Sequence, residues 1–223
     1  MLLYEDKILL LPAKCGSRSI VAGIEGKHFG HRHEPLHNLT LDEICARNVY
    51  MIIRDPYSWY ESFYNHRIWK MKLKESEWWG HKFKQTKFED ALFDYCYGAE
   101  RQEVVEKGGI LNGAQFGGEF FKDIPNHMLY QNLWGVGYYS QTMMWTCCKE
   151  LKEKYQWNTD IKFIMMGDFE ALSNEGFVVT NRVKIGSGKY KPNEWSDVMR
   201  HWVKQKDAAF WDYVQSNLVS SSN

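Results

Sequence analysis

The chain has 223 residues, with 28 Lys and Arg against 28 Asp and Glu and therefore no formal net charge at pH 7. Hydrophobic residues make up 44% of it and charged residues 25%, which excludes disorder, collagen-like repeats and a membrane bundle and fits one globular domain with a continuous core. Because the charges balance, we expect no attraction to nucleic acid or anionic lipid through net charge, so any anion must bind at a local site.

The first elements alternate between apolar runs and helix-like segments. The run Lys7–Leu11, ended by Pro12, predicts a strand that is buried on both faces of a parallel sheet. A glycine-containing turn then leads into a helix predicted over Ser19–Ile24. Thr40 and Glu43 have the spacing of a capping box, in which each side chain bonds the other residue's backbone N–H, and this predicts the start of a short helix.

A second strand and a longer helix follow. Val49–Ile53 is again a continuous apolar run and predicts a buried strand. After Arg54-Asp55-Pro56, the segment Tyr57–Lys72 predicts a helix with proline in its first turn, where the missing N–H removes no helical hydrogen bond.

The middle of the chain contains two more predicted helices. A second capping-box pattern, Thr86 to Glu89, precedes a helix predicted over Asp90–Tyr97. The glycine-rich residues 108–118 predict a loop. Ser140 is then a candidate N-cap for a helix that extends to Tyr155.

The last elements are a third strand and a long helix. Ile161–Met166 predicts the strand, and Asn193 is a candidate cap for the helix. The apolar residues expected on one face of this helix are Trp195, Val198, Met199, Trp202 and Val203. Because strands alternate with helices and no repeat or linker divides the chain, the sequence predicts a single α/β domain with a largely parallel sheet.

The cysteines and the first apolar run bear on the compartment. The five cysteines show no repeated pair spacing, which disfavours a disulfide framework or zinc ribbon and favours a reducing compartment. The apolar run at residues 8–12 is far shorter than the roughly 18 residues that a membrane span needs. We therefore expect a cytoplasmic protein without a membrane partner.

The segment between the first strand and the first helix has the chemistry of an anion site. Backbone N–H groups and the helix dipole converge on an anion at such a position. Gly16 permits close backbone approach, Ser17 and Ser19 offer hydroxyl donors, and Lys14 adds a compact positive charge. The Walker pattern of nucleotide kinases is absent, because the lysine precedes the glycine. The sequence indicates a phosphate-binding loop, with a simple helix-capping turn as the alternative.

Two motifs resemble those of the PAPS-dependent sulfotransferases, PAPS being 3′-phosphoadenosine 5′-phosphosulfate. Lys14-x-Gly16-Ser17-x-Ser19 resembles the family's 5′-phosphosulfate loop, P-K-x-G-[ST]-[ST]-[ST]. The segment from Ile53 to Tyr64 resembles the 3′-phosphate motif V-R-[DN]-P-x-x-R-x-x-S-x-Y, and its matching residues are Arg54, Ser62 and Tyr64.

The chain also departs from these motifs. Trp59 stands where the family usually has a second arginine, and Arg18 stands where it usually has Ser or Thr. Farther along, Phe163–Leu172 looks like the late strand of the Golgi-type carbohydrate sulfotransferases, and Asn181–Tyr190 is similar to their C-terminal loop, which closes over the nucleotide. The short interval from Lys14 to Arg54 implies a compact, soluble member of that branch.

The resemblance implies a fold, a reaction and a set of site residues. The fold is a three-layer P-loop-like α/β fold with a largely parallel central sheet flanked by helices, in one sulfotransferase-like domain over residues 1–223. The reaction moves a sulfuryl group from PAPS to a hydroxyl or amine of a small-molecule or carbohydrate acceptor, without a metal. The implied cofactor-binding residues are Lys14, Cys15, Gly16, Ser17, Arg18, Ser19, Arg54, Ser62, Ser187, Gly188 and Lys189.

The catalytic candidates are Lys14 and a histidine. Lys14 is expected to stabilise the charge that develops on the bridging oxygen of the leaving group. A base must take the acceptor's proton, and histidine suits that role near neutral pH. Between the two phosphate motifs, His33 is the first candidate and His31 the second. A polar surface loop, or a metal site that also uses His37, is the alternative explanation of these histidines.

Other residues have less specific patterns. Asp168 and Glu170 either orient partners or cap a helix. Lysines and tryptophans interleaved between residues 67 and 87 predict either an acceptor-docking surface or a solvated helix face, and Asn126–Gln131 resembles a segment near the acceptor. The competing functions are a P-loop-type nucleotide or small-molecule kinase and a nucleotide-binding module without turnover.

Overall fold

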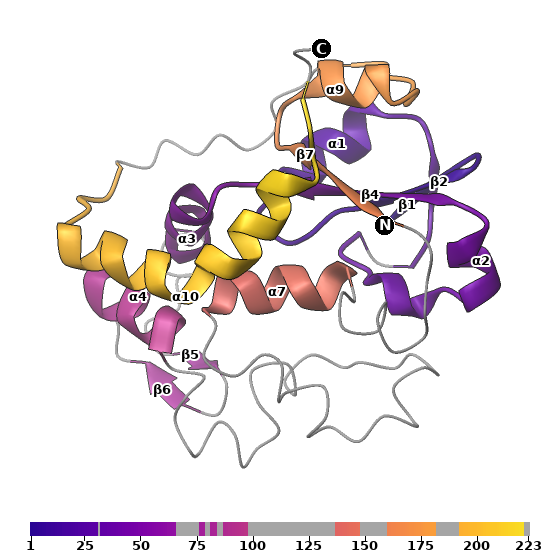
Figure 1. The fold of residues 1–223 in the computed structure, drawn as a ribbon. Helices are drawn as coiled ribbons and strands as arrows, with labels where there is room; N and C mark the ends of the chain where they lie inside the picture. Colours follow the sequence, from indigo (N-terminus) through magenta and orange to yellow (C-terminus); the bar gives the residue numbers. More distant parts are fainter. Residues whose placement is uncertain are drawn as a thin grey trace. The chain divides into compact units, whose positions relative to one another are not determined.

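The computed structural model describes residues 1–30, 32–65, 76–78, 81–83, 87–97, 137–147, 160–181 and 192–220 (Figure 1). The chain divides into two compact units. The first unit comprises Met1–Arg54, Thr142–Lys189 and Asp212–Asn223, and the second comprises Asp55–Gln141 and Tyr190–Trp211. In the part of the chain that is described, no helix is long and apolar enough to cross a membrane.

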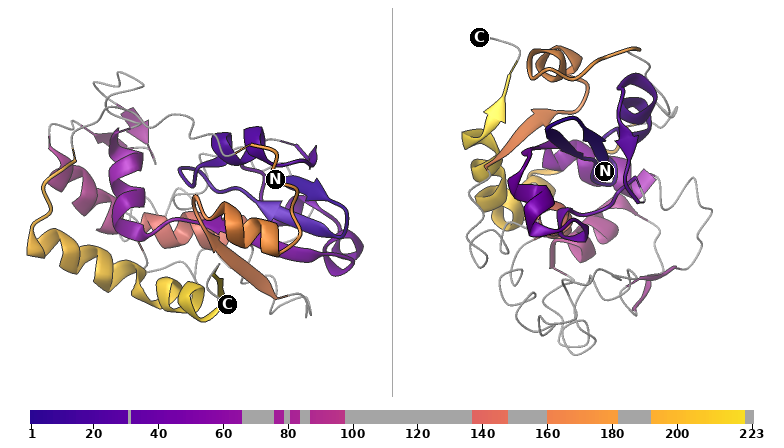
Figure 2. Two further views of the ribbon diagram at one scale, coloured as in Figure 1. Left: turned by 90° about the horizontal axis from the view of Figure 1, so that it is seen from above. Right: turned by 90° about the vertical axis from the view of Figure 1, so that its right-hand side faces the viewer.

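The first unit contains a six-stranded mixed sheet in its described residues. Its order is β3-β1-β2-β4-β7-β8, and β2, β4, β7 and β8 are parallel to one another while β1 is antiparallel to β2 and β3 (Figures 1 and 2). The strands are β1 (Leu2–Tyr4), β2 (Lys7–Leu10), β3 (Lys27–His28), β4 (Asn48–Ile53), β7 (Ile161–Met165) and β8 (Leu218–Val219). The prediction of an α/β fold with a mostly parallel sheet flanked by helices is confirmed at this level.

The three predicted strands form the centre of this sheet. Ile8, Leu9 and Leu10 of β2 are fully buried, as expected for a strand with apolar side chains on both faces. The register pairs Leu10 with Met51 of β4, and Ile53 of β4 with Met165 of β7. The carboxyl ends of these parallel strands therefore lie at the same edge of the sheet.

Short strands beside the predicted core, such as β1 and β8, were not expected. β1 folds back on β2 through a turn in which Glu5 has a φ of 50°, in the left-handed region. β8 pairs with β7 through only two residues, Leu218 and Val219. Segments this short do not show a strand period, and β8 in addition pairs with a strand distant in sequence.

Helices α1 (Ser17–Gly23), α2 (Leu41–Cys45) and α9 (Phe169–Asn174) belong to the first unit, with a 3-10 turn over Leu36–Asn38. The predicted capping box is confirmed: Thr40 Oγ1 accepts from Glu43 N, and the Glu43 carboxylate accepts from Thr40 N at 2.8 Å. Asp168 caps α9, since its Oδ1 accepts from Ala171 N at 2.9 Å. Of the two explanations of this carboxylate, helix capping is the one observed.

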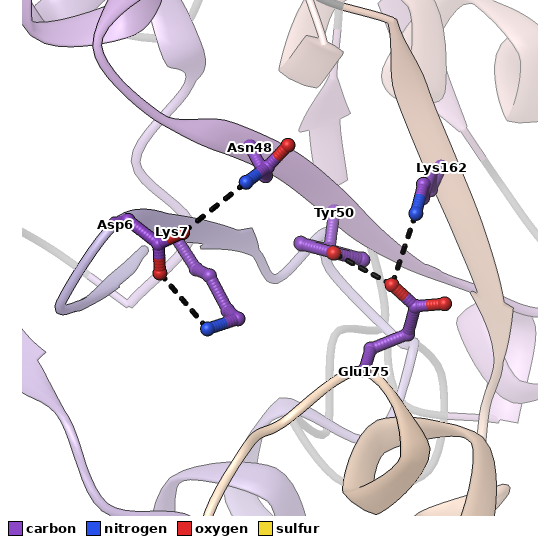
Figure 3. A network of polar contacts seen from close by, with 6 residues as sticks. All are labelled: Asp6, Lys7, Asn48, Tyr50, Lys162 and Glu175. Carbon is purple, nitrogen blue, oxygen red and sulfur yellow. Dashed lines mark hydrogen bonds and ion pairs between the residues drawn. The ribbon is translucent and has the colours of Figure 1, made fainter.

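A polar network joins Glu175, which follows α9, to side chains of β4 and β7 (Figure 3). Glu175 Oε2 accepts from Tyr50 Oη at 2.6 Å and from Lys162 Nζ at 3.0 Å. Burial raises the pKa of Glu175, but the hydrogen bonds from Tyr50 and Lys162 outweigh it and leave this pKa lowered. Nearby, Asp6 accepts from Lys7 Nζ at 2.9 Å and from Asn48 Nδ2 at 3.3 Å.

The second unit contains α3 (Pro56–Asn65), the hairpin of β5 (Ser76–Trp78) and β6 (His81–Phe83), and α4 (Phe88–Tyr97). Helices α7 (Tyr138–Cys147) and α10 (Asp197–Ser216) begin in the second unit and end in the first. Proline is the first residue of α3, as predicted, and Asp55 Oδ1 accepts from Ser58 N at 2.9 Å. The predicted extension of α3 to Lys72 and of α7 to Tyr155, the capping residue Thr86 and the glycine-rich loop lie outside the described residues.

Two predicted helix caps are wrong. Ser140 lies in the first turn of α7, inside the helix, and its hydroxyl donates to Asp207 Oδ1 at 2.6 Å. The last helix begins at Asp197, where Ser196 Oγ accepts from Met199 N at 3.2 Å. Asn193 instead donates to Glu61. For Ser140, a partner distant in sequence replaces the predicted local hydrogen bond. For Asn193, a serine closer to the first turn takes the capping position.

The buried face of α10 also differs from the prediction. Met199 and Val203 are buried, but Val198 is 54% exposed. The buried row continues with Asp207, Phe210 and Val214. Asp207 is the unexpected member, because a carboxylate is seldom fully buried unless hydrogen bonds satisfy it.

Candidate functional site

The loop between β2 and α1 has two left-handed residues. Cys15 N donates to Pro12 O at 3.4 Å and closes a four-residue turn. Within and after this turn, Lys14 has a φ of 67° and Gly16 a φ of 72°. The conformation is ordinary for glycine but uncommon for lysine, and backbone strain of this kind is concentrated at functional sites.

The start of α1 follows directly from Gly16. Ser19 N and Ile20 N donate to Gly16 O at 2.9 and 3.1 Å, and no described side chain caps the helix. The N–H groups of Ser17 and Arg18 have no acceptor within the helix, as at any helix N-terminus. The loop therefore contains both backbone N–H donors and a cationic residue, Lys14, within one short segment.

The side chains of this loop differ in exposure. Cys15 is fully buried and Ser17 is buried. Lys14 and Ser19 are half-buried, and Arg18 is exposed. Lys14 is thus the cation that lies within the turn itself.

Arg54 joins the loop from the neighbouring parallel strand. It follows β4 directly, is half-buried, and donates from Nη1 to Lys14 O at 3.4 Å. Since β2 and β4 are adjacent and parallel, their carboxyl ends bring the lysine of one predicted motif next to the arginine of the other. These two residues are 40 positions apart in sequence.

The third parallel strand contributes a residue that the sequence did not indicate. Met166 follows β7, and its backbone N donates to Ile53 O at 2.7 Å. A Cβ placed on Gly16 would lie 2.8 Å from Met166 Cγ and 3.1 Å from its Sδ. The thioether therefore packs against the left-handed glycine of the loop. Only the position of Met166 at a strand end was visible in the sequence.

His33 lies beside the end of β2. Its Nδ1 is 2.7 Å from Leu11 O, and Leu11 precedes Lys14 by three residues. A carbonyl oxygen only accepts hydrogen bonds, so Nδ1 carries a proton in this contact, and the neutral ring has its lone pair on Nε2. Of the other candidates, His31 lies outside the described residues, and only the backbone of His37 is described.

The remaining predicted residues are not brought to this loop by any described contact. Ser62 is half-buried on α3, in the second unit. Trp59, which stands where the sulfotransferase motif has a second arginine, is fully buried and stacks on Phe63 with ring centroids 4.9 Å apart. Its side chain is core of the second unit. Three of the predicted residues, Ser187, Gly188 and Lys189, lie outside the described residues, as does the segment Asn126–Gln131. Of the interleaved lysines and tryptophans, only the side chain of Lys87 is described, and it is exposed.

The described residues contain no group of three or more His, Cys, Asp and Glu side chains arranged to hold a metal ion. The described cysteines, Cys15, Cys45, Cys96 and Cys147, form no disulfide bond.

Comparisons with protein-family models, with curated proteins and with solved structures found no match. Functional inference therefore depends on the motifs and on the geometry of this sheet edge.

Proposed function

We propose that the protein is a PAPS-dependent sulfotransferase that binds the phosphates of its donor at the carboxyl edge of β2 and β4. The observation that supports this most is the hydrogen bond from Arg54 to the carbonyl of Lys14. It joins the lysine of the 5′-phosphosulfate motif to the arginine of the 3′-phosphate motif. Two cationic residues joined in this way, beside backbone N–H donors, suit a nucleotide with phosphate groups at both its 5′ and 3′ positions.

The proposal includes a P-loop-like version of the α/β fold. In this arrangement the phosphate loop follows a buried parallel strand and opens a helix, as the loop between β2 and α1 does. Ligands of open α/β sheets bind outside the carboxyl ends of the strands, which is where the loop, Arg54 and Met166 lie.

The proposed reaction is an in-line transfer at sulfur. An acceptor hydroxyl or amine forms a bond to sulfur while the bond from sulfur to the bridging phosphate oxygen breaks, and adenosine 3′,5′-bisphosphate leaves. Negative charge grows on that bridging oxygen, and the ammonium group of Lys14 stabilises it more in the transition state than in the ground state. No step requires a metal ion.

His33 is the proposed base. Its contact with Leu11 O fixes the proton on Nδ1, so Nε2 is the nitrogen that takes the acceptor's proton. The backbone carbonyl has the orienting function that a carboxylate has in other histidine bases. The proposed acceptor is a small molecule or a carbohydrate, and the proposed compartment is the cytoplasm.

Calorimetric titration tests the donor site. Adenosine 3′,5′-bisphosphate should bind at least about tenfold more tightly than 5′-AMP, a difference of about 1.4 kcal/mol from the additional phosphate contact. Arg54→Ala should remove this preference. Arg47→Ala is the matched control, because Arg47 precedes β4 at its opposite end and bonds Glu43 O instead.

The same titration separates the alternatives. Equal affinity for the two nucleotides would contradict the assignment of Arg54, and tighter binding of ATP than of the bisphosphate would favour the kinase. For turnover, His33→Ala should lower kcat by about 10²–10⁴-fold while leaving bisphosphate affinity unchanged. His28→Ala, at an exposed position on β3, is its control. Equal rates in the two variants would place the base elsewhere.

A further inference from the structure

The side chain of Met166 occupies the space that Gly16 leaves open. Its backbone is held at the end of β7 by the hydrogen bond to Ile53 O. From there the side chain reaches the loop, since its Cγ and Sδ lie 2.8 and 3.1 Å from the position of a Cβ on Gly16. The thioether therefore packs beside Gly16, the residue between the turn and the first residue of α1.

Met166 is also accessible to a small oxidant. It is 36% exposed, whereas Met1, Met51, Met143 and Met199 are at most 3% exposed. Met144 and Met165 are half-buried, so Met166 is the most exposed of the described methionines, and methionine oxidation follows exposure. The contact with Gly16 and this exposure are independent observations on the same side chain.

Oxidation by hydrogen peroxide would change this contact. The Sδ lone pair attacks one peroxide oxygen, the O–O bond breaks, and water leaves. The thioether loses two electrons and becomes a sulfoxide, and the peroxide is reduced. The new oxygen makes a side chain that packs beside Gly16 larger and polar.

We propose that Met166 is a peroxide-sensitive modification site whose oxidation displaces the loop between β2 and α1 from its packed position. A flexible, apolar methionine fills the space beside Gly16, and the larger, polar sulfoxide packs less favourably against the loop, which favours a shift of the loop. The effect of this shift on nucleotide affinity rests on the proposed function. The shift itself does not.

The test starts with hydrogen peroxide and the full chain, without nucleotide. Peptide mass mapping should find Met166 oxidised at least about tenfold faster than Met199. Hydrogen exchange of the peptide spanning residues 12–19 should become faster after oxidation and return to its original rate after treatment with methionine sulfoxide reductases. The Met166→Leu variant keeps a similar side-chain volume without sulfur, and peroxide should not change its exchange.

Each outcome decides the proposal. Oxidation of Met166 no faster than that of Met199 overturns it, as does unchanged loop exchange in the oxidised protein. Cys45 is exposed and also reacts with peroxide, so a change of exchange that persists in Met166→Leu overturns it too. Adenosine 3′,5′-bisphosphate is then titrated against both forms. Binding to neither form refutes the proposed function and leaves the oxidation result standing.

Discussion

Replacing Asp207 by Asn should change how the stability of the second unit depends on pH. Asp207 is 1% exposed on α10. Its carboxylate accepts hydrogen bonds from Tyr60 Oη at 2.8 Å, Ser140 Oγ at 2.6 Å and Ser140 N at 3.0 Å. There is no room beside it for a further carbon, because a Cβ on Gly137 would lie 2.7 Å from its Oδ2. The substitution removes the charge and almost preserves the shape.

The magnitude follows from the balance between burial and hydrogen bonding. Burial raises the pKa of Asp207 from 3.8 to about 6, although the hydrogen bonds from Ser140 and Tyr60 and the charge of Lys206 act in the opposite direction. The folded protein therefore keeps a proton that the unfolded chain releases between about pH 4 and pH 6. Stability from this group is complete below about pH 4 and falls by about 3 kcal/mol as the pH rises through about 6.

The assay is urea unfolding followed by tryptophan fluorescence at several pH values from about 3.5 to 7.5. The unfolding free energy of the wild type minus that of Asp207→Asn should decrease by about 3 kcal/mol over this range and become constant above about pH 7. Asp197→Asn is the matched control, because Asp197 is an exposed carboxylate of the same helix and unit. The control should follow the pH dependence of the wild type.

A constant difference between the wild type and Asp207→Asn would refute the reasoning, because Asp207 would then titrate alike in the folded and unfolded chains. A difference that increases with pH would refute it in the other direction. In that case the hydrogen bonds from Tyr60 and Ser140 would outweigh burial.

Three further changes have expected outcomes. Gly23→Ala places a Cβ 2.0 Å from the backbone oxygen of Asn181 and should lower the unfolding free energy by at least about 2 kcal/mol in urea titrations. An unchanged or raised unfolding free energy, as an ordinary helical Gly→Ala change gives, would contradict this close approach. Tyr50→Phe removes a 2.6 Å hydrogen bond to Glu175 and should cost about 1 kcal/mol in thermal unfolding, and an unchanged Tm would mean that the bond adds nothing. If the proposed function holds, Lys14→Ala should lower the rate of bisphosphate release from PAPS by about 10²-fold or more, and a wild-type rate would reduce the loop to a helix cap.

Local patterns in the sequence were sufficient to predict the central strands and one helix cap. The apolar runs that became β2, β4 and β7 predict buried strands, because desolvating their side chains requires cover on both faces. The capping box of Thr40 and Glu43 is confirmed because all of its hydrogen bonds lie within four residues. These features depend on groups that are neighbours along the chain.

Predictions that required a choice among distant partners were less accurate. Ser140 has the chemistry of an N-cap, but its hydroxyl and amide both donate to Asp207, which is 67 residues away. Ser196, and not Asn193, caps α10, because Ser196 is closer to the first turn of the helix. A hydrogen-bonding side chain takes the partner that packing places nearest, and the sequence does not specify that distance.

The same division applies to the candidate site. The sequence by itself predicted that Lys14, Gly16 and Arg54 follow buried strands, and it showed their resemblance to phosphate-binding motifs. That Arg54 bonds the carbonyl of Lys14, that His33 bonds Leu11 O, and that Met166 fills the space beside Gly16 were decided only by the tertiary structure. The physical reason is that strand order and register set these contacts, and both result from burying the whole sheet at once.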